Sequence, residues 1–450
     1  MASSRKPKRP ESSAADAAGA CLAAHVAAGE RVVVALSGGL DSIVLLDLLA
    51  RMASRRRFTL RALHVNHQLS PHAARWATFC RVQCRARKIP LTVVRVQVPR
   101  RDSLEAQART LRLAAFAAQK ADWIATAHHA DDQAETVLYR LLRGAGTRGL
   151  AGIPVTRPLA GAAGPKLLRP LLGVPRAVLA DYARRRRLAW VEDESNTDTR
   201  HDRNFLRQRV LPLIEEHFPQ ARRTLARAAA LAASSVALEA SLARADAGAA
   251  ADRLSVAALQ ALVPARAENV LRWFIAEHGV PPPPAVRLQE ALRQLTTARA
   301  DAQVNVAWGD AALRRHRGTV HLVAVRPAAR DLNLRWAGER RLAVSALGGT
   351  LTMTPALGQG LSAARLRGRR VEVRVRQGGE RLRPEPGRAA RSLKNLLQEA
   401  GVAAWIRDAW PLLYVNGELA AAPGVSIDAA WQAGPGEPGM LPGWQPAGMD

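Results

Sequence analysis

The sequence is poor in cysteine and has no long hydrophobic run, and both shortages exclude classes of protein. Its 450 residues contain three cysteines, Cys21, Cys80 and Cys84, an odd number without paired spacing that excludes a disulfide framework and fits a reducing cytoplasm. Cys80 and Cys84 stand four residues apart in a helix-like stretch, so we predict packed core thiols there. No run approaches the ~18 apolar residues of a membrane span. Asp16 and His25 interrupt the Ala-rich N-terminal stretch, so we expect no cleaved signal peptide and no membrane partner.

Acidic residues are also scarce, 38 against 66 Lys and Arg, which leaves a net charge of +28. A charge this positive indicates nucleic acid or an anionic membrane surface as partner. Only six of the basic residues are lysine, so a compositional bias toward arginine stays open as the source of part of the excess. With 48% apolar residues the chain can bury a core, and its length predicts two to four domains.

Short apolar strands alternate with helical stretches over the first third of the chain. This alternation predicts an α/β fold, a doubly wound parallel sheet with helices on both faces. Ligands of such sheets bind at the carboxyl ends of the strands, so we expect the loops at 37–42, 65–68 and 128–132 to converge on one crevice. Strands are predicted over 31–36, 58–65, 91–98 and 123–127, and helices over 42–52, 72–87, 104–120 and 131–142.

Shifts in composition divide the chain further. A small α+β middle domain and a C-terminal mostly-β or α+β domain are expected to follow the parallel-sheet domain, in which 144–164 is a mobile loop. The expected boundaries are a disordered basic tail over 1–28, a parallel-sheet domain over 29–219, a linker helix and middle domain over 220–330, a C-terminal domain over 331–433 and a disordered tail over 434–450.

The most informative motif follows the first strand and opens a helix. Its glycines let the backbone approach a ligand closely, and its hydroxyls and helix-start amides donate to an anion. Asp41 cannot bind phosphate directly, so its carboxylate predicts a bridging Mg²⁺. The loop is not a Walker A motif, because the Gly-Lys-Ser/Thr ending is missing. Its residues are Ser37, Gly38, Gly39, Leu40, Asp41 and Ser42.

This loop resembles that of the PP-loop ATP pyrophosphatases, which split ATP into AMP and pyrophosphate while adenylating a substrate. The segment TAHHADDQAET (126–136) is similar to the matching motif of one branch, the tRNA(Ile)-lysidine synthetases. Gln68 and Leu113 depart from the glycine and the aromatic residue usual in that family. Other motifs follow in family order: HVNH (64–67), EAQAR (105–109), LRG (142–144), RPL (169–171), EDESN (192–196), RNFLR (203–207), GGE (378–380), LKNL (393–396) and PLL (411–413).

The resemblance implies a cytoplasmic ligase that uses ATP and Mg²⁺ to join free L-lysine to the wobble cytidine of the CAU-anticodon isoleucine tRNA. The cytosine 2-oxygen attacks the α-phosphate and pyrophosphate leaves; the lysine ε-amine then displaces AMP from carbon 2 and gives lysidine. The domains after Gln220 are expected to supply most of the charge that grips the tRNA. A homodimer is compatible with the sequence, which does not determine the oligomeric state.

The reaction implied by the resemblance assigns roles to individual residues. Residues 37–42 hold the pyrophosphate, with Mg²⁺ near Asp41. Asp132 and Glu135 lie three residues apart on one helix face, so we assign them to the lysine amine, one of them removing its proton. His128 is the candidate contact to the adenylating phosphate, and a purely structural histidine is equally compatible.

The remaining assignments concern anions. Arg112 is the candidate for the lysine carboxylate, with Arg109 as the alternative. Asn196, Arg203 and Arg207 are assigned to phosphate contacts on RNA or nucleotide; a solvated face paired with acidic residues 192 and 193 is the alternative.

Three rival functions remain to be separated. A sulfur-transferring tRNA enzyme needs cysteines at the site, and Cys80 and Cys84 lack that placement. A small-molecule amide synthetase leaves the +28 charge unexplained. An inert RNA-binding protein is disfavoured because Asp41, Asp132 and Glu135 are all present.

Overall fold

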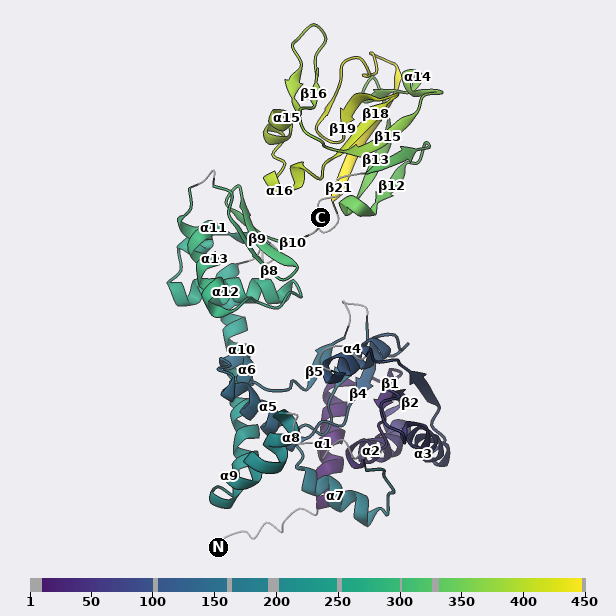
Figure 1. The fold of residues 1–450 in the computed structure, drawn as a ribbon, viewed down its shortest axis with the longest axis vertical. Helices are drawn as coiled ribbons and strands as arrows, with labels where there is room; N and C mark the ends of the chain where they lie inside the picture. Colours follow the sequence, from purple (N-terminus) through teal and green to yellow (C-terminus); the bar gives the residue numbers. More distant parts are fainter. Residues whose placement is uncertain are drawn as a thin grey trace. The chain divides into compact units, whose positions relative to one another are not determined.

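The computed structural model describes residues 10–99, 104–159, 164–192, 202–248, 253–299, 302–325 and 332–446 (Figure 1). The chain divides into two compact units, Met1–Glu239 and Ala240–Asp450.

The first unit contains a six-stranded sheet with the order β3-β2-β1-β4-β6-β5. All neighbouring strands run parallel except β5, which pairs antiparallel with β6 at the edge. The predicted parallel sheet is therefore confirmed. The strands are β1 (Arg31–Ala35), β2 (Thr59–Asn66), β3 (Leu91–Arg95), β4 (Trp123–Ala125), β5 (Thr156–Pro158) and β6 (Lys166–Leu168).

Helices cover both faces of this sheet, because alternate residues of β1 enter two different cores. Val32 and Val34 belong to the larger core, which includes residues of α2, α3 and α7. Val33 belongs to a smaller core with Phe116 of α4. The helices are α2 (Leu40–Arg56), α3 (Ala73–Ala86), α4 (Leu104–Ala117), α5 (Ala130–Leu142) and α7 (Arg176–Arg185).

The expectation of a disordered tail over residues 1–28 is wrong for its larger part. Residues 10–25 form a helix, α1 (Pro10–His25). Ala14, Ala18 and Leu22 recur every four residues and are fully buried in the larger core. Small side chains at this spacing let α1 pack closely against α7 and α2. Residues 1–9 lie outside the described residues.

The described part of the expected mobile loop, residues 144–159, contains a short helix, α6 (Thr147–Leu150), and strand β5. Side chains of α5 hold it in place. The Gln133 side chain binds the amide (2.6 Å) and the carbonyl (3.2 Å) of Ile153, and Arg140 donates to the carbonyls of Gly149 and Gly152. The Gly/Pro content suggested a free loop, but these hydrogen bonds fix it to α5.

Four further helical segments complete the first unit: α8 (Asp202–Phe205), a π-helical turn η2 (Leu206–Val210), α9 (Leu211–His217) and α10 (Ala221–Ala247). The last of these continues into the second unit. Within the described part of the chain, α10 alone is long and apolar enough to cross a membrane by length and composition, and one such helix is weak evidence for a span.

The second unit begins with the predicted α+β middle domain. Its antiparallel sheet has the order β7-β10-β9-β8 and shares a core with the helices. The elements are β7 (Leu254–Ser255), α11 (Val256–Gln260), α12 (Pro264–Glu277), α13 (Ala285–Thr297), β8 (Asn305–Trp308), β9 (Ala311–His316) and β10 (Thr319–Ala324).

The C-terminal domain is rich in strands, as predicted, with sheets ordered β11-β15-β18-β19-β20 and β12-β13-β21-β14 and a two-stranded pair β16-β17. Its strands are β11 (Asn333–Trp336), β12 (Arg341–Val344), β13 (Gly349–Leu357), β14 (Leu361–Ser362), β15 (Val371–Val375), β16 (Arg381–Leu382), β17 (Arg391–Ser392), β18 (Pro411–Val415), β19 (Glu418–Ala422), β20 (Ser426–Ile427) and β21 (Pro438–Pro446). Its helices are η3 (Ser345–Leu347), α14 (Ala363–Leu366), α15 (Leu393–Glu399) and α16 (Ala404–Arg407).

The expectation of a disordered tail over residues 434–450 is also wrong. Residues 438–446 form β21, which pairs with β13 along its whole length, and Trp444 is buried in the core. Pro438, Pro442 and Pro446 are separated by even numbers of residues, so their nitrogen atoms all face the same edge of the strand. The hydrogen bonds that proline cannot donate are therefore lost on that one edge. A Pro/Gly-rich sequence can therefore form this strand. Residues 447–450 lie outside the described part.

Candidate active site

The loop that contains residues 37–42 joins β1 to α2 at the carboxyl end of a central strand. Gly38 has a φ of +95°, and a Cβ there would lie 3.0 Å from Val191 and 3.3 Å from Cys80, so both the turn and the packing require glycine. Gly39 is the N-cap of α2 and makes no side-chain cap. The first-turn amides of this 17-residue helix therefore keep the arrangement that binds phosphate.

The two serine hydroxyls shape this loop from within. The Ser42 hydroxyl accepts from the Gly38 amide (3.1 Å) and donates to the Gly39 carbonyl (2.9 Å). Ser37 Oγ lies 3.1 Å from Ser42 Oγ and accepts from the Gly39 amide (3.3 Å). We expected both hydroxyls to donate to a bound anion; in this structure they support the backbone that presents the amides.

Asp41, in the first turn of α2, faces the imidazole of His129 and the guanidinium of Arg176. Its Oδ2 lies 3.6 Å from His129 Nε2, and its Oδ1 lies 3.6 Å from Arg176 Nε. Burial acts to raise the pKa of Asp41, but the hydrogen bond and charge of His129, helped by Arg176 and Arg207, lower it below its ordinary value. Asp41 Oδ1 is buried without a hydrogen-bond partner. An ionised carboxylate with an oxygen that makes no hydrogen bond suits a hard cation.

Helix α5 begins with a capping box in which a histidine is the N-cap. His129 Nδ1 accepts from the Asp132 amide (3.3 Å), and Asp132 Oδ2 accepts from the His129 amide (3.0 Å). Burial acts to lower the pKa of His129, but Asp41, Asp132 and Asp131 raise it above its ordinary value. The box uses one oxygen of Asp132 and leaves Oδ1 for another partner.

Asp132 and Glu135 lie on one face of α5, as predicted, and both bind Arg207. Arg207 Nε donates to Glu135 Oε1 (2.6 Å), and Nη2 donates to Glu135 Oε2 (2.9 Å) and Asp132 Oδ1 (3.2 Å). Glu135 is only 3% exposed. Burial acts to lower the pKa of Arg207, but the hydrogen bond to Glu135 and the nearby carboxylates raise it. The two carboxylates therefore form a cation site, which Arg207 occupies.

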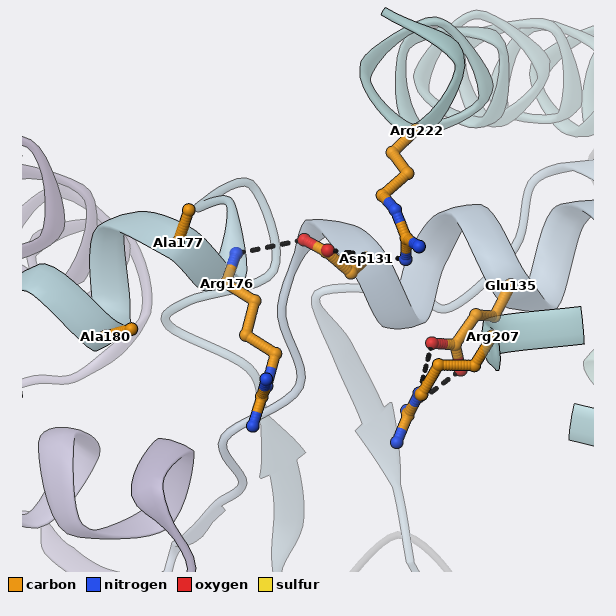
Figure 2. Close-up of a pocket in the computed structure, with 7 residues that line it drawn as sticks. All are labelled: Asp131, Glu135, Arg176, Ala177, Ala180, Arg207 and Arg222. Atoms are coloured by element: carbon orange, nitrogen blue, oxygen red, sulfur yellow. Dashed lines mark hydrogen bonds and ion pairs between the residues drawn. The ribbon is translucent and has the colours of Figure 1, made fainter. Parts of the chain in front are cut away.

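A cavity of about 360 Å³ opens beside this cation site (Figure 2). Asp131 connects its walls: its Oδ1 accepts from the Arg176 amide at the start of α7 (2.9 Å), and its Oδ2 lies 3.5 Å from Arg222 Nη1 on α10. The cavity thus combines carboxylates, guanidinium groups and a small apolar wall. Its lining residues are Asp131, Glu135, Arg176, Ala177, Ala180, Arg207 and Arg222.

His128, directly before the N-cap of α5, has a different environment from His129. Its Nδ1 lies 2.9 Å from Thr126 Oγ1. Burial and the charges of Arg169, Arg112 and Arg109 lower the pKa of His128 to about 3. The imidazole is therefore neutral at physiological pH and stands among guanidinium groups. Such a cluster suits an anion.

Sequence comparison identifies the family to which these features belong. A model of the PP-loop domain matches residues 13–214, one of the TilS substrate binding domain matches residues 254–321, and one of the TilS substrate C-terminal domain matches residues 371–444. The tRNA(Ile)-lysidine synthase of Nitrosomonas europaea is 39% identical over 95% of this chain and 94% of its own length. That of an Azoarcus species is 43% identical over 94% of each chain, and that of Aromatoleum aromaticum is 42% identical over 94% of this chain and 99% of its own.

The chain belongs to the tRNA(Ile)-lysidine synthase family. The family assignment that the motifs suggested is thus confirmed, and the three matched segments fall in the parallel-sheet, middle and C-terminal domains.

The structure brings most of the predicted residues of this family member together, with exceptions. Asp41, Asp132 and Glu135 are linked through His129 and Arg207. Arg203 is exposed on α8 and acts with burial to lower the pKa of Arg140, away from the carboxylate pair. Asn196 lies outside the described residues.

Sequence reasoning missed several residues of the site, namely Asp131, His129, Arg169, Arg176 and Arg222. The first two stand within the TAHHADDQAET segment, and Arg169 within RPL, so those motifs contained the signal. Arg176 is the first residue of α7, and Arg222 is the second residue of α10. No sequence pattern marks these two residues. They line the cavity only because the fold places the starts of α7 and α10 beside α5.

Proposed function

We propose that this protein joins free lysine to the wobble cytidine of a CAU-anticodon isoleucine tRNA, with ATP converted to AMP and pyrophosphate. The observation that carries the proposal is a carboxylate pair, Glu135 buried and Asp132 half-buried, next to the loop of residues 37–42. His129 Nε2 lies 3.6 Å from Asp41 in the loop and 3.5 Å from Asp132 in the pair. The reaction needs this combination, because an amine must meet an adenylated base.

The residues of the PP-loop fit ATP with Mg²⁺. The uncapped first turn of α2 supports binding of the pyrophosphate portion, and the unpartnered Oδ1 of Asp41 supports a metal ligand there. Mg²⁺, when bound, neutralises charge that builds up on the departing pyrophosphate. One carboxylate is sufficient on the protein side, since Mg²⁺ takes its other ligands from phosphates and water.

The guanidinium cluster around His128 supports contact with the α-phosphate. Arg109 and Arg112, expected to hold the lysine carboxylate, both act on His128, and Arg169 in the same group has its own pKa lowered to about 10 by burial, Arg157 and Arg109. Three guanidinium groups stand close together here, and their mutual repulsion is offset better by an anion with more than one negative charge than by a single carboxylate. We therefore assign Arg109 and Arg112 to the phosphate.

The cavity in Figure 2 supports a site for free lysine. Glu135 offers a partner for the ε-ammonium, Arg176 or Arg222 offers one for the carboxylate, and Ala177 and Ala180 line the wall beside the apolar stem. A zwitterionic amino acid with a long side chain needs this distribution of charges. Glu135 or Asp132 then removes the proton from the amine, which attacks carbon 2 of the cytosine as AMP leaves with the 2-oxygen.

Mass spectrometry of the wobble nucleoside tests the proposal. After incubation of the full chain with ATP, Mg²⁺, lysine and the CAU-anticodon isoleucine tRNA, we expect cytidine to gain one lysine, with one pyrophosphate released per modified base. Pyrophosphate release without lysine incorporation contradicts the proposed acceptor. Incorporation of sulfur contradicts the reaction class.

Two variants separate the two steps. Asp41→Asn should abolish pyrophosphate release while tRNA binding persists. Glu135→Gln should still adenylate the tRNA but lose lysine incorporation by about a hundredfold or more, because a charge-paired carboxylate of the amine site is removed. Glu216→Gln, an exposed carboxylate on α9, is the matched control and should retain both steps. Normal lysine incorporation by Glu135→Gln contradicts the amine assignment.

A further inference from the structure

We infer that Arg207 occupies the ammonium site of lysine in the ligand-free protein and leaves it when lysine binds, moving toward the phosphates at Asp41. This inference rests on the proposed function, because it concerns the order of events at that site. It also explains why one arginine fits two roles that seem incompatible, a partner of carboxylates and a partner of phosphate.

The Arg207 guanidinium occupies the position from which a lysine ammonium would approach the carboxylate pair. Both oxygens of Glu135 and Oδ1 of Asp132 accept from the guanidinium, and Oδ2 of Asp132 accepts from the His129 amide. Each of the four oxygens thus already has a partner. A lysine ammonium that approaches Glu135 meets the Arg207 guanidinium on the same carboxylate, and repulsion between the two positive charges at that distance favours the departure of Arg207.

Without a bound cation, the carboxylate pair would destabilise the folded protein. Arg207 supplies that cation when lysine is absent. Glu135 is 3% exposed, and a buried carboxylate without a partner is strongly destabilising. Arg207 supplies that partner through a bidentate hydrogen-bonded pair, the strongest form of such contact. Its own side chain is 39% exposed, so surrounding atoms do not enclose it.

The structure also indicates where the guanidinium goes. Arg207 and Asp41 are joined through two intervening side chains. Arg207 Nη2 donates to Asp132 Oδ1 (3.2 Å), and His129 Nε2 lies 3.5 Å from Asp132 Oδ2 and 3.6 Å from Asp41 Oδ2. The charge of Arg207 also helps to lower the pKa of Asp41. Arg207 stands in η2, a five-residue π-helical turn between α8 and α9, and such turns interrupt helices at functional sites. A short rotation of the side chain from Glu135 toward Asp41 brings it to the nucleotide phosphates. Binding of lysine is then coupled to the movement of the Arg207 guanidinium to the phosphates.

Kinetics of Arg207→Ala and Arg207→Lys test this competition. If Arg207 fills the site for nine-tenths of the time, its removal should lower the KM for lysine about tenfold. The rate constant for pyrophosphate release should fall in the same variant, because the phosphates lose a cation. Arg207→Lys keeps a charge beside Glu135 but makes a single point contact, so its KM for lysine should fall less. Methylguanidinium should compete with lysine in Arg207→Ala and restore the higher KM.

The controls keep the possible outcomes distinct. Arg209→Ala removes an equal charge from an exposed side chain two residues away and should leave both constants unchanged. A KM for lysine that is unchanged or higher in both Arg207 variants overturns the inference, and Arg207→Lys, which keeps a cation beside Glu135, decides the matter if Arg207→Ala does not fold. Absence of lysidine even with the unaltered chain overturns the proposed function instead.

Discussion

The neighbouring residues His128 and His129 show how strongly local charge determines the chemistry of a side chain. Burial acts on both rings in the direction of a lower pKa. Carboxylates around His129 reverse the effect, whereas arginines around His128 add to it. The sequence places two identical residues side by side, and only the fold separates their environments. His128 therefore acts as a neutral hydrogen-bonding group, and we do not expect it to contribute a positive charge to phosphate binding.

Histidine hydrogen–deuterium exchange at the ring C2 position, followed by mass spectrometry with fragmentation between the two residues, measures both pKa values directly. We expect no inflection for His128 between pH 5 and pH 8 and an inflection above pH 6.5 for His129. Between pH 6.5 and about 3 the unfolded chain binds a proton at His128 and the folded chain does not. The contribution of His128 to stability therefore decreases as the pH falls through this range. That of His129 is full below pH 6.5 and is lost as the pH rises through its raised value. An inflection for His128 near 6.5 contradicts the arginine cluster.

At the scale of single elements, the sequence was sufficient where one local pattern determined the structure. The run RVVVAL and the loop after it predicted β1 and the start of α2, because a buried parallel strand and a helix N-terminus have distinct patterns. The pair Asp132 and Glu135 was found for the same reason. Local patterns were misleading for α1 and β21, which look like polar or Pro/Gly-rich tails and are ordered by packing against distant elements.

Helix α1 tests this point, because its stability depends on tertiary contacts. Leu22 is fully buried in the larger core, so Leu22→Ala should destabilise the first unit by about 2–5 kcal/mol. Leu238→Ala, on a side chain of α10 that is 72% exposed, is the matched control and should change stability by less than about 0.5 kcal/mol. Urea unfolding monitored by tryptophan fluorescence measures both. Equal effects of the two substitutions show that α1 does not pack as the structure has it.

At the scale of the whole molecule, the +28 charge is not where we expected it. Residues 1–219 contain 36 basic and 19 acidic residues, a net charge of +17, and residues 220–450 contain 30 and 19, a net charge of +11. In the C-terminal domain several arginines are also neutralised by ion pairs, such as Arg370 with Glu372 and Arg388 with Glu385. The distribution of charge therefore favours RNA binding by both the catalytic domain and the later domains over RNA binding by the later domains alone.

Salt dependence of tRNA binding distinguishes these contributions, because each lost phosphate contact lowers the slope of log K against log salt by about 1. Arg367 and Lys394 are exposed and make no ion pair among the described residues, so Arg367→Gln and Lys394→Gln should each reduce the slope by about that amount. Arg388→Gln, whose charge Glu385 already neutralises at 2.7 Å, should change it less.

The double variant Arg367→Gln/Lys394→Gln measures how much of the salt dependence comes from the C-terminal domain. If the catalytic domain shares the grip, most of the slope must remain in this variant, since the larger charge excess lies before residue 220. Fluorescence anisotropy with labelled tRNA between about 50 and 200 mM salt covers the range in which the effect is large. A fall in the slope far beyond the value of about 2 that two lost contacts explain would mean that RNA binding depends on the C-terminal domain. In that case the charge excess of the first 219 residues would reflect compositional bias toward arginine rather than contact with RNA.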